Sequence, residues 1–87
     1  MSRTALLRAL DDTIAAAHRL EAGGRVDRVS LGRLLEELAA RRGEVAAGQG
    51  LDREWAGRTV RWVAGWLPDG ELPLLARLGA IVRAAAP

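Results

Sequence analysis

The sequence predicts an all-α protein: a single helical domain over residues 1–87, built as a small bundle of about four amphipathic helices. Three observations favour this fold class. Apolar residues recur with the period of a helix in four segments of the chain. Capping residues, glycines and prolines separate these segments at short intervals, as in a bundle with short loops. Apolar residues make up 49% of the chain and charged residues 28%, the balance of a folded globular protein.

The first helix is expected over residues 3–22. Ser2 is a suitable N-cap, because its hydroxyl can accept a hydrogen bond from a free backbone N–H. Gly23-Gly24 ends the helix, since glycine adopts the left-handed conformation common after helix C-termini. The connector that follows is predicted as a loop, with a possible short extended segment near residues 25–30. One apolar face runs along the helix: Leu6, Leu7, Leu10, Ile14, Ala17 and Leu20.

The second helix is expected to begin at Ser30. Val29 precedes this cap, and Leu34 lies four helical positions after it, which is the spacing of a hydrophobic staple. The apolar face that follows has helical spacing: Leu31, Leu34, Leu35, Leu38 and Ala39.

On the other side of this helix, Arg33, Glu37 and Arg41 can pair at i, i+4. Gly43 weakens the helix, and Gly48-Gln49-Gly50 must end it.

The third helix, residues 52–67 with Asp52 as N-cap, contains every aromatic residue of the chain. Trp55, Trp62 and Trp66 are spaced i, i+7 and i+11, so they fall within roughly 40° of one another around the helix. A second apolar stripe widens this face to about 160°. Its members are Ala56, Val60, Val63 and Leu67.

Leu67-Pro68-Asp69-Gly70 predicts a turn, because proline presets φ and Asp-Gly favours a tight reversal. The last helix is expected over residues 72–85, with Pro73 tolerated in its first turn only. It has one apolar face: Leu74, Leu75, Leu78, Ile81, Val82 and Ala85.

The residue types needed for catalysis and metal binding are scarce. The chain has no cysteine and a single histidine, His18, so thiolate chemistry and histidine-cluster metal sites are excluded. Asp11-Asp12 and Glu36-Glu37 are sequence neighbours, which point about 100° apart on a helix and cannot act as an acid–base pair. We therefore expect no enzyme, no metal, no cofactor and no small-molecule substrate.

Charge and hydropathy indicate a soluble protein. The net charge is +2, and all thirteen basic residues are arginine. The longest uncharged runs are about seven residues, far below the roughly twenty that cross a bilayer, and the N-terminus has no signal-peptide core. We expect a cytoplasmic protein with no membrane partner.

The apolar arc of the third helix is wider than one neighbouring helix covers, and Trp and Arg are characteristic interface anchors. We therefore expect a protein–protein interaction or accessory module that self-associates through this helix as a homodimer. A simpler interpretation places the tryptophans in the core of the bundle. The expected partner-binding residues are Trp55, Trp62, Trp66, Arg58 and Arg61.

An alternative function is a small DNA-binding regulator. Residues 25–31 as a strand, 31–42 as one helix and 52–67 as a second resemble ribbon-helix-helix repressors locally, although the loop after Gly43 is longer than in that pattern. The resemblance implies a two-stranded sheet between two copies at residues 26–30 and arginine contacts to phosphates.

Overall fold

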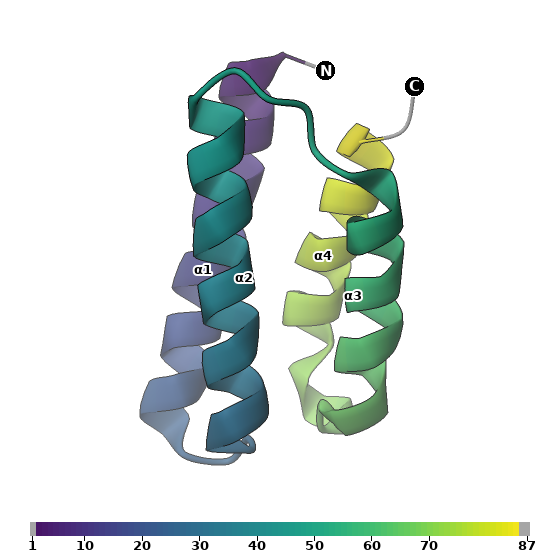
Figure 1. Ribbon diagram of the computed structural model, residues 1–87. Helices are drawn as coiled ribbons and strands as arrows, with labels where there is room; N and C mark the ends of the chain where they lie inside the picture. Colours follow the sequence, from purple (N-terminus) through teal and green to yellow (C-terminus); the bar gives the residue numbers. More distant parts are fainter. Residues whose placement is uncertain (1, 86–87) are drawn as a thin grey trace.

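Two antiparallel helical hairpins lie side by side in this protein (Figure 1). The computed structural model describes residues 2–85. The first hairpin joins α1 (Arg3–Gly23) to α2 (Arg28–Ala46), and the second joins α3 (Arg53–Trp66) to α4 (Leu72–Ala85) through a short 3-10 helix, η1 (Asp69–Glu71). Residues 2–85 contain no strand. The predicted all-α bundle of four helices is confirmed, and the possible extended segment near residues 25–30 is not formed.

Local hydrogen bonds set most helix ends where the sequence predicts them. Ser2 Oγ accepts the Ala5 N–H at 3.1 Å and so caps α1. Asp52 Oδ1 accepts two first-turn N–H groups of α3, at 2.9 and 3.3 Å. Gly24 follows α1 with a φ of 70°, in the left-handed region that glycine adopts without steric cost. These three predicted caps are confirmed.

The start of α2 was predicted wrongly. The helix begins at Arg28, and its N-cap is Asp27, whose carboxylate accepts both the N–H of Ser30 at 3.0 Å and its hydroxyl at 2.6 Å. A carboxylate that accepts both donors caps better than the Ser30 hydroxyl alone, so α2 starts two residues earlier. Val29 is 81% exposed, and the predicted hydrophobic staple to Leu34 is absent.

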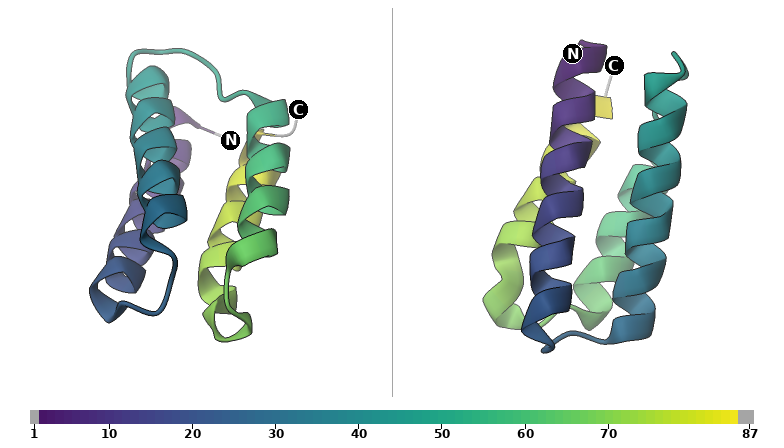
Figure 2. Two further views of the ribbon diagram at one scale, coloured as in Figure 1. Left: turned by 60° about the horizontal axis from the view of Figure 1, so that its bottom comes forward. Right: turned by 90° about the vertical axis from the view of Figure 1, so that its left-hand side faces the viewer.

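The four helices do not approach one another equally. Close Cα approaches join α1 to α2, α3 to α4 and α1 to α4, whereas the backbones of α2 and α3 stand further apart (Figure 2). Helix spacing depends on the side chains at the contact. Ala16 and Ala17 are buried on α1, where small side chains permit close packing.

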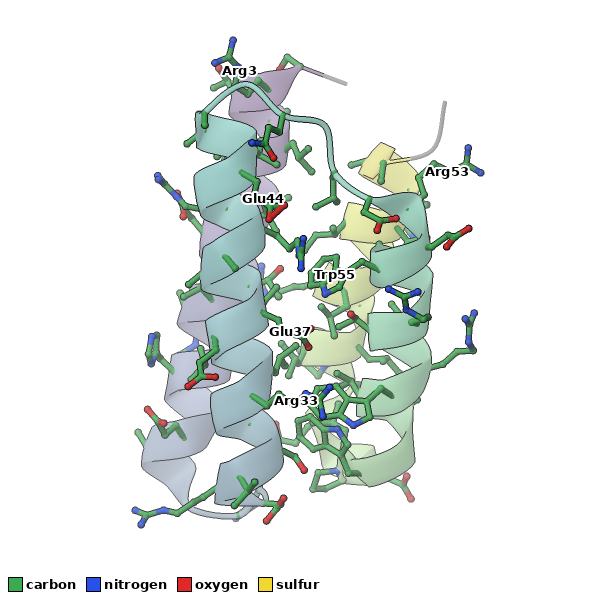
Figure 3. The ribbon with its side chains drawn as sticks, viewed as in Figure 1. Arg3, Arg33, Glu37, Glu44, Arg53 and Trp55 are labelled. Atoms are coloured by element: carbon green, nitrogen blue, oxygen red, sulfur yellow. The ribbon has the colours of Figure 1, made fainter. Side chains whose placement is uncertain are left out.

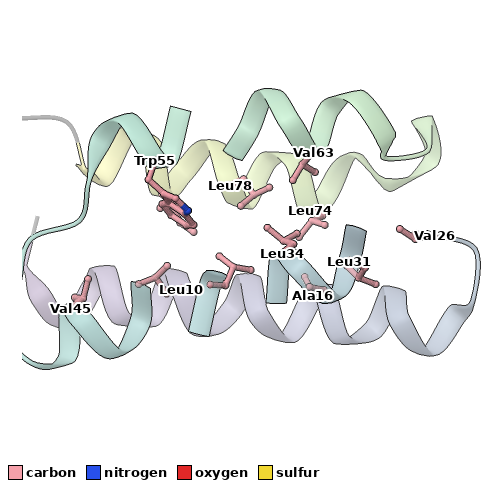
Figure 4. Packing of buried hydrophobic residues seen from close by; sticks show 14 residues of the cluster. Leu10, Ala16, Val26, Leu31, Leu34, Val45, Trp55, Val63, Leu74 and Leu78 are labelled. Carbon is pink, nitrogen blue, oxygen red and sulfur yellow. The ribbon is translucent and has the colours of Figure 1, made fainter. Parts of the chain in front are cut away.

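The core lies between the hairpins, and each of the four α-helices contributes to it (Figure 4). Most of its members are aliphatic, and Trp55 is its one buried aromatic residue. None of the described helices is both long and apolar enough to cross a membrane. The buried apolar residues are Leu10, Ala16, Ala17, Val26, Leu31, Leu34, Leu38, Val45, Trp55, Ala56, Val63, Leu74, Leu78 and Ile81.

Candidate functional site

Arginines of α2 lie over tryptophans of α3 across the wide space between these two helices. Arg33 Cζ lies 5.5 Å from the ring centroid of Trp62, and Arg41 Cζ lies 5.4 Å from that of Trp55. The two helices are antiparallel, so a step of eight residues on α2 (~12 Å) matches a step of seven on α3 (~10.5 Å). The two Arg–Trp contacts are therefore in register, and each is a favourable cation–π arrangement.

Glutamates on α2 hold these two arginines to different degrees. Arg41 Nη1 donates to both carboxylate oxygens of Glu44, at 2.9 and 3.0 Å. Arg33 Nε lies 4.0 Å from Glu37 Oε2, at the outer limit of an ion pair. The predicted pairing of Arg41 with Glu37 is thus replaced by a pair with Glu44, because Arg41 lies over Trp55. Figure 3 shows Arg33, Glu37 and Trp55 pointing into the space between α2 and α3.

The three tryptophans divide into one core residue and a partly exposed pair. Trp55 is 4% exposed, and its indole Nε1 is buried with no hydrogen-bond partner among the described residues. Trp62 and Trp66 are half-buried and pack edge to face, with ring centroids 5.2 Å apart and an interplanar angle of 67°. The core interpretation therefore describes Trp55, whereas Trp62 and Trp66 keep surface that another molecule can reach.

The two predicted arginines of α3 lie in different places. Arg58 is at the edge of the space between α2 and α3, where its Nη1 is 4.0 Å from Glu54 Oε2. Arg61 is exposed and lines a shallow depression of about 390 Å³ on the outer face of α3, which Arg58 also borders. The structure thus brings Arg58 together with Trp62, whereas Arg61 lies on the outer face alone.

A hollow of about 300 Å³ opens between the two helices. Its floor includes Thr59, which is 5% exposed, and its walls carry two guanidinium groups against one carboxylate. The hollow is therefore aromatic and has a formal charge of +1. It is lined by Arg33, Glu37, Trp55, Arg58, Thr59 and Trp62. We call the space with this lining and the adjoining Trp66 the α2–α3 groove.

The α2 side of the groove was not predicted. Arg33, Glu37 and Arg41 were interpreted as an outward-facing ladder of charges, because their i, i+4 spacing is typical of solvated helix surfaces. The separation of Arg33 from Arg41 along α2 matches the separation of Trp55 from Trp62 along α3. This match is the signal in the sequence that could have indicated the α2 side of the groove. It becomes informative only when the two helices are known to be antiparallel neighbours.

Two further pairs of titratable groups lie away from the groove. His18 Nδ1 is 3.5 Å from Glu21 Oε1 on the exposed side of α1. Arg42 Nε donates to Asp11 Oδ1 at 3.0 Å, which ties α2 to α1 and raises the pKa of Arg42. Among residues 2–85, no group of three His, Cys, Asp or Glu side chains is placed to hold a metal ion.

Comparison with protein-family models, curated proteins and solved structures gives no match for this chain. Any functional proposal therefore rests on the α2–α3 groove.

Proposed function

We propose that this protein is a non-enzymatic, cytoplasmic interaction module that binds another polypeptide at the α2–α3 groove. The observation that carries the proposal is the partial exposure of the Trp62–Trp66 pair beside the loosely paired Arg33 and Arg58. Tryptophan and arginine contribute most of the binding energy in many interfaces, because they bury large areas and make directed polar contacts.

Self-association through α3, as a homodimer, is one form of this function. It requires the same partly exposed surface of Trp62 and Trp66. A two-fold pairing of the groove with itself would bring together two linings that each carry Arg33 and Arg58 against one carboxylate, that of Glu37. Like charges brought together in an interface are unfavourable, so the groove fits a different polypeptide better than a second copy.

The alternative of a ribbon-helix-helix DNA-binding regulator has less support. That function requires a strand at residues 26–30, and residues 28–30 form the first turn of α2. The exposed arginines of α3 remain the feature in its favour, so duplex DNA belongs among the probes.

A selection from a random-peptide display library tests the proposed function. We expect peptides to be enriched on the full chain and to lose binding to Trp66→Ser. A matched control is Leu72→Ser, because Leu72 is an exposed apolar residue outside the groove. Circular dichroism and thermal unfolding must show that both variants fold.

Sedimentation equilibrium at tens of micromolar protein tests whether the chain forms a homodimer. A dimer that dissociates in Trp66→Ser supports the proposal, as does a Trp66-dependent peptide. A monomer on which the selection enriches no Trp66-dependent peptide would refute it.

A further inference from the structure

We infer that the α2–α3 groove takes an acidic side chain of its partner, held between Arg33 and Arg58, and that the partner segment is acidic with flanking apolar residues. This inference rests on the proposed function and names the chemistry of the polypeptide that the groove binds.

The first argument is that the guanidinium groups of Arg33 and Arg58 have hydrogen-bond donors that their neighbouring glutamates do not use. A guanidinium carries five N–H donors. Arg41 and Arg42 use theirs within the chain, at 2.9–3.0 Å from Glu44 and at 3.0 Å from Asp11. Arg33 and Arg58 lie 4.0 Å from their glutamates, beyond hydrogen-bond distance. The side chain of Arg33 is 70% exposed and that of Arg58 62%, so both can turn toward a ligand.

The second argument is that two arginines from different helices line the same hollow. Arg33 comes from α2 and Arg58 from α3, and both line the same hollow of about 300 Å³. The rings of Trp55 and Trp62 and the buried Thr59 form the less polar part of its lining. A carboxylate placed there can accept charge-assisted hydrogen bonds from both walls, and such bonds are roughly twice as strong as neutral ones. Glu37 is the only acid of the lining, and Glu54, which lies 4.0 Å from Arg58, is outside it.

The third argument concerns what surrounds the hollow. Trp62 and Trp66 are partly exposed on the α3 side, although Nε1 of Trp66 is buried. Val29, at 81% exposure, precedes Arg33 by four residues on α2 and so lies on the same side of that helix. A free carboxylate ion would leave these apolar surfaces uncovered. A polypeptide that inserts one Asp or Glu can cover them with its neighbouring apolar side chains, which commits the occupant to an acidic peptide segment.

The experiment uses the display selection on the full chain, followed by fluorescence anisotropy with individual labelled peptides. We expect the enriched peptides to share an Asp or Glu with apolar neighbours. Replacing that acid by its amide should weaken binding at least tenfold, because a lost charge-assisted hydrogen bond contributes more than the factor of ten set by 1.4 kcal/mol. Arg33→Gln and Arg58→Gln should each weaken it to a similar extent.

The matched control is Arg3→Gln, which removes the same charge at the N-terminal end of α1, away from Arg33 and Trp55 (Figure 3). It should leave peptide affinity within about twofold at moderate salt, because exposed charges far apart are screened. Both groove variants replace exposed side chains, so they should fold, and thermal unfolding checks this.

The outcomes separate the two proposals. If no peptide is enriched in a Trp66-dependent manner and the protein is monomeric, the proposed function fails together with this inference. If the peptides depend on Trp66 but carry no acid, or if Arg58→Gln binds them normally, only this inference fails. Binding of duplex DNA that Arg33→Gln and Arg58→Gln abolish, in place of acidic peptides, would assign the arginines to nucleic acid and overturn it as well.

Discussion

The guanidinium of Arg41 covers the ring of Trp55, with Arg41 Cζ 5.4 Å from the ring centroid. The contact joins α2 to α3 where their backbones stand apart. Arg41 also forms a two-oxygen pair with Glu44, yet its Nε is buried with no hydrogen-bond partner among the described residues. Its contribution to stability therefore combines a favourable stacking and packing contact with an unfavourable buried donor.

Two substitutions at Arg41 separate these effects. Arg41→Ala removes the stem that packs on Trp55 together with the charge, and should lower the free energy of unfolding by roughly 1–2 kcal/mol. Arg41→Met keeps an unbranched stem and removes the buried Nε, whose missing partner costs about 1–3 kcal/mol. Arg41→Met should therefore stay within about 1 kcal/mol of the wild type in urea denaturation. An equal loss for both variants would show that the charge dominates.

Trp55 and Trp62 should differ sharply in their effect on stability. Trp55 is 4% exposed and central to the core, so Trp55→Ala should cost roughly 3–5 kcal/mol, much of the stability of a small domain. Trp62 is half-buried at the groove edge, and Trp62→Ala should cost less than half as much. Trp55→Phe is the matched variant, because it keeps most of the buried area and removes an indole N–H that lacks an acceptor. Equal losses for Trp55→Ala and Trp62→Ala in thermal unfolding would contradict this assignment.

The sequence predicts the helices of this fold better than their mutual arrangement. Helix positions follow from local signals: Ser2 and Asp52 as caps, Gly24 in the left-handed conformation, and apolar residues with helical spacing. Even a local prediction can fail where two capping residues compete, as Asp27 and Ser30 do at the start of α2.

The groove depends on tertiary information that periodicity does not contain. The helical spacing predicts that all three tryptophans share one face of α3. In the structure, α2 covers Trp55 and leaves Trp62 and Trp66 partly exposed. The prediction also missed Arg33, because a charged residue opposite the apolar face is usually solvated. Arg33 lies over Trp62 because the hairpin packing turns this side of α2 toward α3.

Glycine-to-alanine substitutions at two positions should change the free energy of unfolding in opposite directions. Gly24 has a φ of 70°, which strains any residue with a Cβ, so Gly24→Ala should lower the free energy of unfolding by about 1 kcal/mol. Gly43 lies inside α2, where a Cβ would meet nothing within 4 Å. Gly43→Ala should raise stability by up to about 1 kcal/mol, through the higher helix propensity of alanine. Destabilisation by Gly43→Ala in urea denaturation would show that the end of α2 is not helical.

The cap of α2 should make stability depend on pH. Hydrogen bonds from the Ser30 hydroxyl and N–H hold the pKa of Asp27 below its ordinary value of 3.8. The folded state therefore binds a proton at Asp27 less readily than the unfolded state. The resulting stabilisation is fully present above the unfolded pKa and is lost as pH falls through the lower folded pKa. The difference in unfolding free energy between the wild type and Asp27→Ala should be constant from pH 5 to 7 and shrink below about pH 4.

Ser30→Ala supplies the matched test for this pH effect. It leaves the Ser30 backbone N–H bond to Asp27 in place and removes the hydroxyl bond of 2.6 Å, the larger cause of the lowered pKa. The pKa of Asp27 should rise toward its ordinary value, so stability should fall less steeply with acid than in the wild type. Urea denaturation at a series of pH values measures this slope, and NMR titration of the Asp27 carboxyl measures the pKa directly. An unchanged slope in Ser30→Ala would show that the Ser30 hydroxyl does not bind the carboxylate of Asp27 in solution.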